Sequence, residues 1–118
     1  MPTLLPGFAR GCSDWNRCRS DSIVSERALR EIYFLAFKTA IGAGAKAVMT
    51  SYNKINGTYA GHNKWLITEV FRGDWVFEGI VMSDWDSIYS AKEAFESGLD
   101  QECPKLSLKP GEAEDVRA

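Results

Sequence analysis

Histidine and cysteine are scarce in this 118-residue sequence, which has one histidine and three cysteines. A structural zinc site needs about four suitably spaced ligands. Cys12, Cys18 and Cys103 form neither an even disulfide set nor a CxxC pair, and His62 lies far from all of them along the chain. We therefore interpret the cysteines as ordinary thiols and expect neither a metal nor a cofactor.

Charge of one sign and long hydrophobic runs are also lacking. The formal net charge is −2, which gives no reason to expect nucleic acid as a partner. No apolar run approaches the ~20 residues of a membrane span, so we expect no membrane partner. Residues 1–6 lack the basic start and the long apolar middle of a signal peptide. The sequence leaves the localisation open between secreted, periplasmic and cytoplasmic.

The hydrophobic pattern predicts helices that alternate with short strands. One apolar stripe at helical spacing comprises Leu29, Ile32, Tyr33, Ala36, Phe37 and Ala40. Ser25 is predicted to cap this helix, and Gly42 and Gly44 to end it. The further predicted elements are a strand over 46–51, a turn over 53–57, a helix over 63–72 with Leu66, Ile67, Val70 and Phe71 inward, a strand over 79–85, a helix capped by Asp86 or Ser87 and ended by Gly98, and part of a strand over 99–103.

Two short segments repeat the same order of residue types. Val48–Tyr52 and Val81–Trp85 both read Val, Met, hydroxyl residue, small polar residue, aromatic, at an offset of 33 residues (81 minus 48). This offset is close to one strand–helix unit, so the strands should be parallel and their polar residues should share one sheet edge. The pattern predicts an α/β fold. A barrel of eight units typically needs ~250 residues, so two to three βα units look like a piece of one.

The end of the second repeated segment carries the most informative residues, Asp84 and Trp85. β-Favouring residues run from Ile80 to Ser83 directly into the carboxylate and the indole. At this end of a strand, an aromatic ring can face a pyranose while a carboxylate attacks or stabilises a cationic anomeric carbon. Taken alone, Asp84 is more commonly a helix-capping residue, and Trp85 and Tyr52 are more commonly aromatics at the rim of a core.

Four blocks of the sequence, in the same order, resemble glycoside hydrolase family 3, the β-glucosidase family. The blocks are Asp21–Tyr33, Val48–Gly57, Asn63–Thr68 and Ser83–Trp85. The resemblance implies a partial (β/α)8 TIM-barrel-like fold, and it implies that the remainder of the barrel and a C-terminal domain are missing partners. The implied division is a divergent N-terminal segment over 1–15, part of the family's N-terminal domain over 16–104, and a divergent tail over 105–118.

The resemblance also assigns roles to five residues. Asp84 matches the catalytic nucleophile of a retaining glycosidase, which forms a covalent glycosyl-enzyme intermediate. The positions that match substrate-binding residues are Trp85 beside the −1 sugar, Tyr52 against the nucleophile, Met49 in the pocket wall and Arg17 on the sugar hydroxyls. From the residues alone, Met49 is core packing unless the barrel is complete, and Arg17 is equally well explained as a solvated side chain.

The implied function is hydrolysis of terminal non-reducing β-D-glycosides, with a β-linked oligosaccharide or glycoside as the partner. A retaining enzyme also needs an acid/base carboxyl group. In this family it usually comes from the C-terminal domain, and the sequence offers no candidate for it. The family's Lys-His-Phe motif stands here as Pro6-Gly7-Phe8, and Val76 replaces a glycine at a position that can have positive φ. We therefore expect the isolated chain to be inactive.

Three other interpretations stay open. The chain could be a decayed remnant or sugar-binding fragment, or an unrelated α/β interaction domain. The β-N-acetylhexosaminidase branch of the family is disfavoured, because its pattern at this strand lacks a counterpart of Trp85 and its acid/base histidine loop is missing here. His62 is expected to be exposed and without a role.

Overall fold

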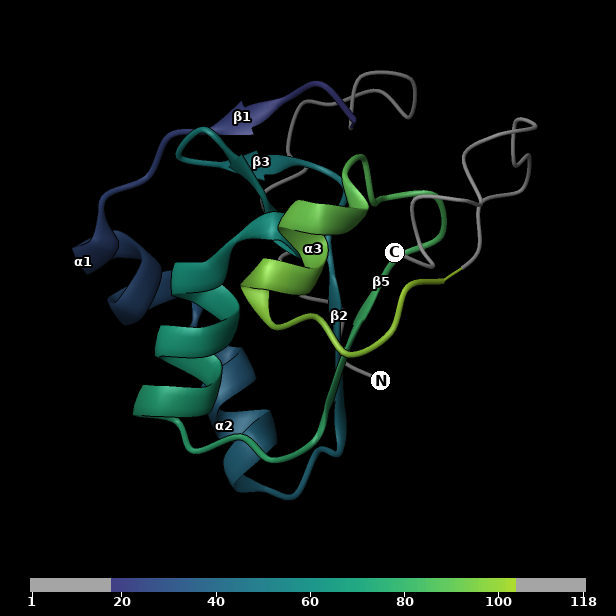
Figure 1. Ribbon diagram of the computed structural model, residues 1–118. Coiled ribbons are helices and arrows are strands. Elements are labelled where there is room, and N and C mark those ends of the chain that lie inside the picture. The colour runs from purple at the N-terminus through teal and green to yellow at the C-terminus, as the bar shows by residue number, and fades with distance from the viewer. Residues whose placement is uncertain (1–17, 104–118) are drawn as a thin grey trace.

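The computed structural model describes residues 18–103, which form short strands alternating with helical segments (Figure 1). This order confirms the α/β class. The strands are β1 (Asp21–Ser22), β2 (Ala47–Thr50), β3 (Lys54–Ile55), β4 (Thr58–Tyr59) and β5 (Ile80–Ser83). The helical segments are α1 (Glu26–Ala28), η2 (Leu29–Tyr33), α2 (Leu35–Gly42), η3 (Ala60–His62), η4 (Trp65–Asp74) and α3 (Ala91–Ser97). In Figure 1, α1, α2 and the teal-green η4 lie to one side of β2 and β5.

Strands β2 and β5 form a parallel pair whose register reproduces the repeat in the sequence. Each residue of β2 pairs with the residue 33 positions later, so that Val48 lies opposite Val81. Both valines are fully buried, which identifies the face of the pair that packs against the helices. The strand expected over 99–103 is present only as a single parallel bridge between Met82 and Gln101.

The helical segment that follows Ser25 has the predicted bounds but not the predicted stripe. Ser25 Oγ accepts a backbone N–H of the first turn at 3.2 Å, which confirms the cap, and the segment ends at Gly42. In the π-helical turn η2, Phe34 N–H donates to Leu29 O at 2.7 Å, five positions back. The extra residue moves the buried position from Ile32 to Phe34. The stripe was therefore wrong at Ile32, Tyr33 and Ala36, all of which are exposed.

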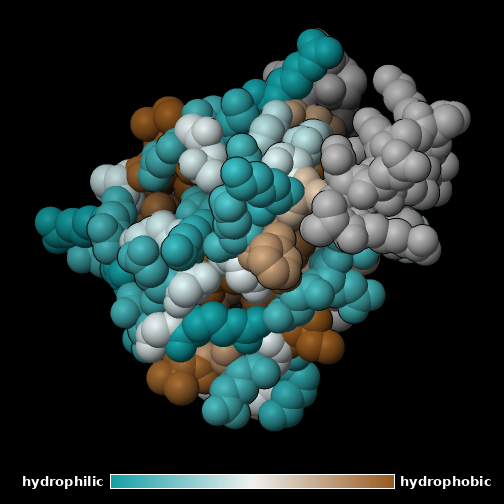
Figure 2. All heavy atoms as spheres, viewed as in Figure 1, coloured by the Kyte–Doolittle hydropathy of each residue, from teal (hydrophilic) through white to brown (hydrophobic). Residues whose placement is uncertain are grey.

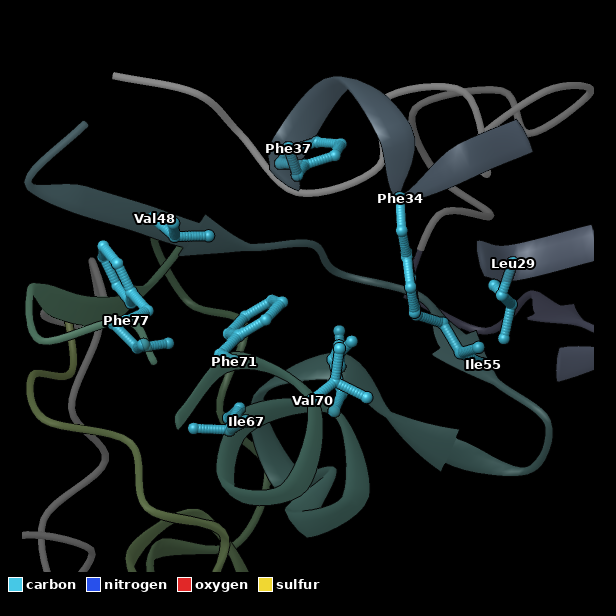
Figure 3. Packing of buried hydrophobic residues seen from close by; sticks show 12 residues of the cluster. Leu29, Phe34, Phe37, Val48, Ile55, Ile67, Val70, Phe71 and Phe77 are labelled. Atoms are coloured by element: carbon cyan, nitrogen blue, oxygen red, sulfur yellow. The ribbon is translucent and has the colours of Figure 1, made fainter. Parts of the chain in front are cut away.

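Helix η4 supplies the centre of the core. Asn63 Oδ1 accepts a backbone N–H of the first turn at 3.1 Å, which confirms the predicted cap. The hydrogen bonds of η4 are of π type rather than α type. The four residues predicted to face inward are all fully buried: Leu66, Ile67, Val70 and Phe71. These four residues belong to the hydrophobic core cluster. Figure 3 shows Val48 and Phe77 at one end of the cluster and Leu29 and Ile55 at the other.

Of residues 53–57, predicted as a turn, Lys54–Ile55 form β3, and Asn56 and Gly57 form the turn of a β-hairpin between β3 and β4. Asn56 (φ 50°) and Gly57 (φ 90°) both have positive φ, as the central residues of a type I′ turn require. Strand β3 also pairs in parallel with β1, which gives a second sheet that the sequence pattern did not predict. The Asn56 side chain ties the hairpin to the chain before α1, because it accepts Val24 N–H at 2.8 Å and donates to Val24 O at 2.7 Å.

Helix α3 begins later than predicted. Its cap is Ser90, whose Oγ accepts the Glu93 N–H at 3.4 Å, and not Asp86 or Ser87. Asp86 has a φ of 59° and lies in a turn between β5 and the helix. The predicted end is confirmed, since Gly98 has a φ of 92° and closes the helix in the left-handed conformation that favours glycine.

Arg72 stabilises the connection from η4 to β5 through hydrogen bonds and an ion pair. Arg72 Nη1 donates to Phe77 O at 2.8 Å and to Gly79 O at 2.6 Å, and Nη2 pairs with Asp100. Asp100 Oδ2 in turn accepts a backbone N–H of β5 at 2.7 Å. Within this connection Val76 has a φ of 51°, which a β-branched residue rarely adopts. The chain therefore places a valine where its backbone favours glycine.

The longest helical element of residues 18–103 is η4, with 10 residues. No helix in this part combines the length and the apolar character that crossing a bilayer requires. In the same residues, no three His, Cys, Asp or Glu side chains are grouped so that they could hold a metal ion. The face in Figure 2 is largely hydrophilic, with separate brown patches of apolar residues.

Candidate active site

The candidate site lies where β2 and β5 end. Because these strands are parallel and in register, the residues that follow them emerge at the same edge of the sheet. Tyr52 follows β2, and Asp84 and Trp85 follow β5. Asp84 N–H donates to Thr50 O at 3.2 Å, so the pairing of the two strands continues to this aspartate. In open α/β sheets, ligands bind outside the carboxyl ends of the strands.

Two donors converge on one oxygen of the Asp84 carboxylate. Oδ1 accepts the Tyr52 hydroxyl at 3.3 Å and the Trp85 backbone N–H at 2.7 Å. Since both bonds fall on the same oxygen, they restrict the rotation of the half-buried carboxylate. The backbone is held as well, because Ser87 Oγ donates to Asp84 O at 2.9 Å. This arrangement suits a nucleophile that must keep one orientation.

The structure brings together three of the five residues expected at the site, namely Tyr52, Asp84 and Trp85. Trp85 is 50% exposed, so its indole is accessible beside the carboxylate. Met49 lies on β2 opposite Met82, and both are half-buried on the face turned away from the helices. Arg17 lies outside the described residues.

Tyr52 is in contact with Tyr89, and Tyr89 with His62; the sequence indicated neither Tyr89 nor His62. The Tyr89 hydroxyl donates to Tyr52 O at 3.5 Å, and His62 Nε2 accepts the Tyr89 N–H at 3.2 Å. The prediction that His62 is exposed was wrong, since only 7% of it is accessible. Burial raises the pKa of the Tyr89 hydroxyl and lowers the pKa of His62. A lone histidine beside a cap residue carries no sequence signal for such burial.

A hollow of about 480 Å³ lies between the β3–β4 hairpin and α3. Its lining consists of Lys54, Gly57, Thr58, Tyr59, His62, Lys64, Glu93, Glu96 and Ser97. Neither Tyr52, Asp84 nor Trp85 lines it. A ligand that reacts at Asp84 would therefore approach from the carboxyl edge of β2 and β5 and not through this hollow.

Comparison with known proteins places the chain in a family. The profile of the Glycosyl hydrolase family 3 N terminal domain matches residues 6–112. The chain belongs to glycoside hydrolase family 3. The resemblance seen in the four sequence blocks is thereby confirmed, and by family the chain is a glycosidase sequence.

Two members of family 3 are 45–50% identical to this chain over the aligned segment. A β-glucosidase of Rhizobium radiobacter is 50% identical over 105 residues, which are 88% of this chain and 13% of that protein. An exo-α-(1→6)-L-arabinopyranosidase of Bifidobacterium breve is 45% identical over 103 residues, 86% of this chain and 14% of that protein. The chain therefore spans about an eighth of the length of the curated relatives it matches.

A solved family 3 structure has the same local fold. β-Glucosidase 3B from Thermotoga neapolitana, solved in complex with α-D-glucose, superposes with a TM-score of 0.72 at 43% identity. The match covers 86% of this chain and 13% of that one. At this identity, the βα arrangement described above is shared with that enzyme.

Proposed function

We propose that the chain contributes the nucleophile side of a retaining glycosidase site. The observation that carries the proposal is the hydrogen bond from the Tyr52 hydroxyl to Asp84 at the shared carboxyl edge of β2 and β5. In a retaining mechanism, one carboxylate attacks the anomeric carbon and a second carboxyl group ~5 Å away protonates the leaving oxygen. Asp84 takes the first of these roles.

The reaction has two displacement steps. First, Oδ2 of Asp84 bonds to the anomeric carbon while the bond to the glycosidic oxygen breaks, and a general acid gives that oxygen a proton. Second, water attacks the anomeric carbon of the glycosyl ester, its proton passes to the same acid/base group, and the Asp84 carboxylate is restored. The Tyr52 hydroxyl and the Trp85 N–H hold Oδ1 and so keep Oδ2 directed at the sugar.

The remaining proposed residues bind the sugar. The accessible indole of Trp85 flanks the −1 sugar, Met49 lines the pocket, and Arg17 binds sugar hydroxyls. The acid/base group is supplied from outside residues 18–103, as in the family pattern, so the isolated chain is proposed to lack turnover.

The proposed architecture is a part of a (β/α)8-type barrel. The parallel pairing of β2 with β5 supports two βα units, because η4 comes after β2 and the β3–β4 hairpin, and α3 comes after β5. The bridge at Gln101 supports the start of a third unit. Residues 16–104 form this part in the proposal, flanked by divergent segments over 1–15 and 105–118. A complete barrel typically has ~250 residues, so the remaining strands and a C-terminal domain are the proposed partners.

The proposed substrates are terminal non-reducing β-D-glycosides, with β-glucosides tested first. The relative from Rhizobium radiobacter carries the name β-glucosidase, which supports this choice. The relative from Bifidobacterium breve is named for an L-arabinopyranoside, so an aryl L-arabinopyranoside belongs in the same assay.

A chimera tests the proposal in a complete protein. The matching 105-residue segment of the Rhizobium radiobacter β-glucosidase is replaced by that of this chain, and hydrolysis of p-nitrophenyl β-D-glucoside is measured. We expect turnover that Asp84→Asn abolishes. Asp86→Asn is the matched control, because Asp86 is a neighbouring carboxylate with a φ of 59°, which asparagine tolerates.

Chemical trapping identifies the nucleophile directly. A 2-deoxy-2-fluoro-β-glucoside with a dinitrophenolate leaving group needs no general acid, so it reports on the nucleophile alone. In the folded chimera, mass spectrometry of peptides should find the sugar on Asp84. A folded chimera that is neither active nor labelled, or one labelled at another residue, would show that the proposed role is wrong.

A further inference from the structure

His62 is a buried titratable group that the proposed mechanism does not use. It lies in η3, between the β3–β4 hairpin and η4, and it is the one histidine of the sequence. Its side chain is 2% exposed. The rings of Tyr59 and Tyr89 pack edge-on against it, with centroids 5.6 Å and 6.1 Å away. A polar ring so enclosed needs a specific hydrogen-bond partner.

That partner fixes which nitrogen carries the proton. A backbone amide can only donate, so His62 Nε2, which lies 3.2 Å from Tyr89 N, must be the unprotonated acceptor. The proton of the neutral ring is therefore on Nδ1. Nδ1 lies 3.1 Å from Glu93 Oε2, although the two groups are not aligned as a hydrogen bond.

The amide that His62 holds belongs to the segment that joins Asp84 to α3. Tyr89 also reaches the site, because its hydroxyl lies 3.5 Å from Tyr52 O. The residue before Tyr89, Ile88, packs tightly on η3, since a Cβ added to Gly61 would lie 2.6 Å from Ile88 Cδ1. Hence η3 supports the segment through one hydrogen bond and one close apolar contact.

We propose that neutral His62, with its proton on Nδ1, is the positioning residue that fixes the segment between Asp84 and α3 through the Tyr89 amide. Protonation would place an N–H on Nε2 opposite the Tyr89 N–H and break this bond. The consequence for catalysis rests on the proposed function, whereas the hydrogen bond and its loss on protonation do not.

Burial and a nearby charge shift the pKa of His62 in opposite directions. Burial lowers the pKa of His62, while the Glu93 carboxylate opposes that shift. Lys54 Nζ lies over the Tyr59 ring, 5.0 Å from its centroid. The titratable or charged side chains that face the imidazole or share the hollow beside it are Glu93, Glu96, Tyr59, Tyr89, Lys54 and Lys64.

The test uses nuclear magnetic resonance of the 118-residue chain with ¹³C,¹⁵N-labelled histidine. Because the sequence has a single histidine, the imidazole signals are unambiguous. We expect the Nδ1–H tautomer at pH 7.5 and a titration midpoint below the ordinary value of about 6.5. Exchange of the Tyr89 amide, corrected for its intrinsic pH dependence, should accelerate about fivefold as the imidazole protonates, the factor expected for one net hydrogen bond.

Three variants separate positioning from simple packing. His62→Gln keeps a neutral acceptor, so Tyr89 protection should persist and lose its dependence on pH. His62→Leu keeps an apolar body but has no acceptor, so the protection should fall. Glu93→Gln removes the nearby charge, which should lower the titration midpoint of His62 and leave the Tyr89 bond in place.

An Nε2–H tautomer, or a Tyr89 amide that is unprotected at pH 7.5 or does not follow the imidazole titration, overturns the proposal. If His62→Leu does not fold, the wild-type titration and His62→Gln decide the question alone. Failure of sugar trapping on Asp84 with the imidazole signals as expected would remove the proposed function and leave the positioning role standing. Sugar trapping on Asp84 together with imidazole signals that differ from those expected would remove only the positioning role.

Discussion

Replacing Val76 by glycine should stabilise the chain, because the backbone at this position already has the conformation of a glycine. Val76 has a φ of 51°, and the left-handed region costs an L-residue roughly 1–2 kcal/mol, with β-branched side chains disfavoured most. Val76 is 69% exposed as a residue, so removal of its side chain loses little buried apolar surface. Against this gain, glycine loses more backbone entropy on folding, at a cost of roughly 0.5–1 kcal/mol.

The balance is a net stabilisation of about 0.5–1 kcal/mol for Val76→Gly. For a domain of this size, 1 kcal/mol shifts Tm by roughly 4–8 °C. Urea unfolding followed by circular dichroism should show a higher midpoint at an unchanged slope, since the surface exposed on unfolding barely changes. Val76→Asn should give a smaller gain, because asparagine tolerates positive φ better than valine does.

Glu78→Gly is the matched control. Glu78 is exposed, lies in the same connection and is not among the described non-glycine residues with positive φ. Glycine there brings only the entropy cost, so this variant should lose roughly 0.5–1 kcal/mol. If Val76→Gly were no more stable than the wild-type chain, or if both glycine variants shifted the midpoint alike, the argument from backbone strain would be refuted.

Three further outcomes are expected. In the chimera, Tyr52→Phe should lower kcat for p-nitrophenyl β-D-glucoside by roughly 3–10-fold without unfolding, because it removes the hydroxyl that orients Asp84; unchanged kinetics would contradict that role. Gly79→Ala should destabilise by several kcal/mol, since a Cβ there would lie 2.2 Å from Lys46 O; a wild-type urea midpoint would contradict the close approach. Because burial lowers the pKa of His62, the unfolded state binds its proton first, so stability is lost as the pH falls below about 6.5 toward the lowered pKa. His62→Gln should lose less stability than wild type between pH 7.5 and 5.5 in urea unfolding, and equal losses would contradict this.

The register of the main strand pair could be predicted from the sequence because the repeat encodes it. Two segments with the same order of residue types, 33 positions apart, become β2 and β5 with the same offset between paired residues. The closeness of Tyr52 and Asp84 then follows from the geometry of parallel strands alone. The caps at Ser25 and Asn63 were equally predictable, since each is a local choice of a polar side chain before an apolar run.

Other features depend on contacts that local patterns do not contain. The π-helical turn replaces a spacing of three or four residues by the five between Leu29 and Phe34, and a count at the α-helical period cannot detect that change. The contact of His62 with the Tyr89 amide joins residues 27 positions apart and exists only once η3 and the segment before α3 are packed. Strand β1 has two residues, too few to show any period.

In the proposed barrel, the stability of the strand pair and the completion of the site depend on the same cover of the sheet. A parallel sheet is normally covered on both faces, and within residues 18–103 the helices cover the face of Val48 and Val81 but not the opposite face. The other face carries Met49 and Ile80, and Ile80 is 50% exposed. In the proposed barrel this face points inward, where side chains of neighbouring strands would fill the space and would also close the sugar pocket around Met49. The chimera should therefore be active and should hold this segment more stably than the isolated chain does. Asp84→Asn in the chimera should remove the activity and leave the added stability.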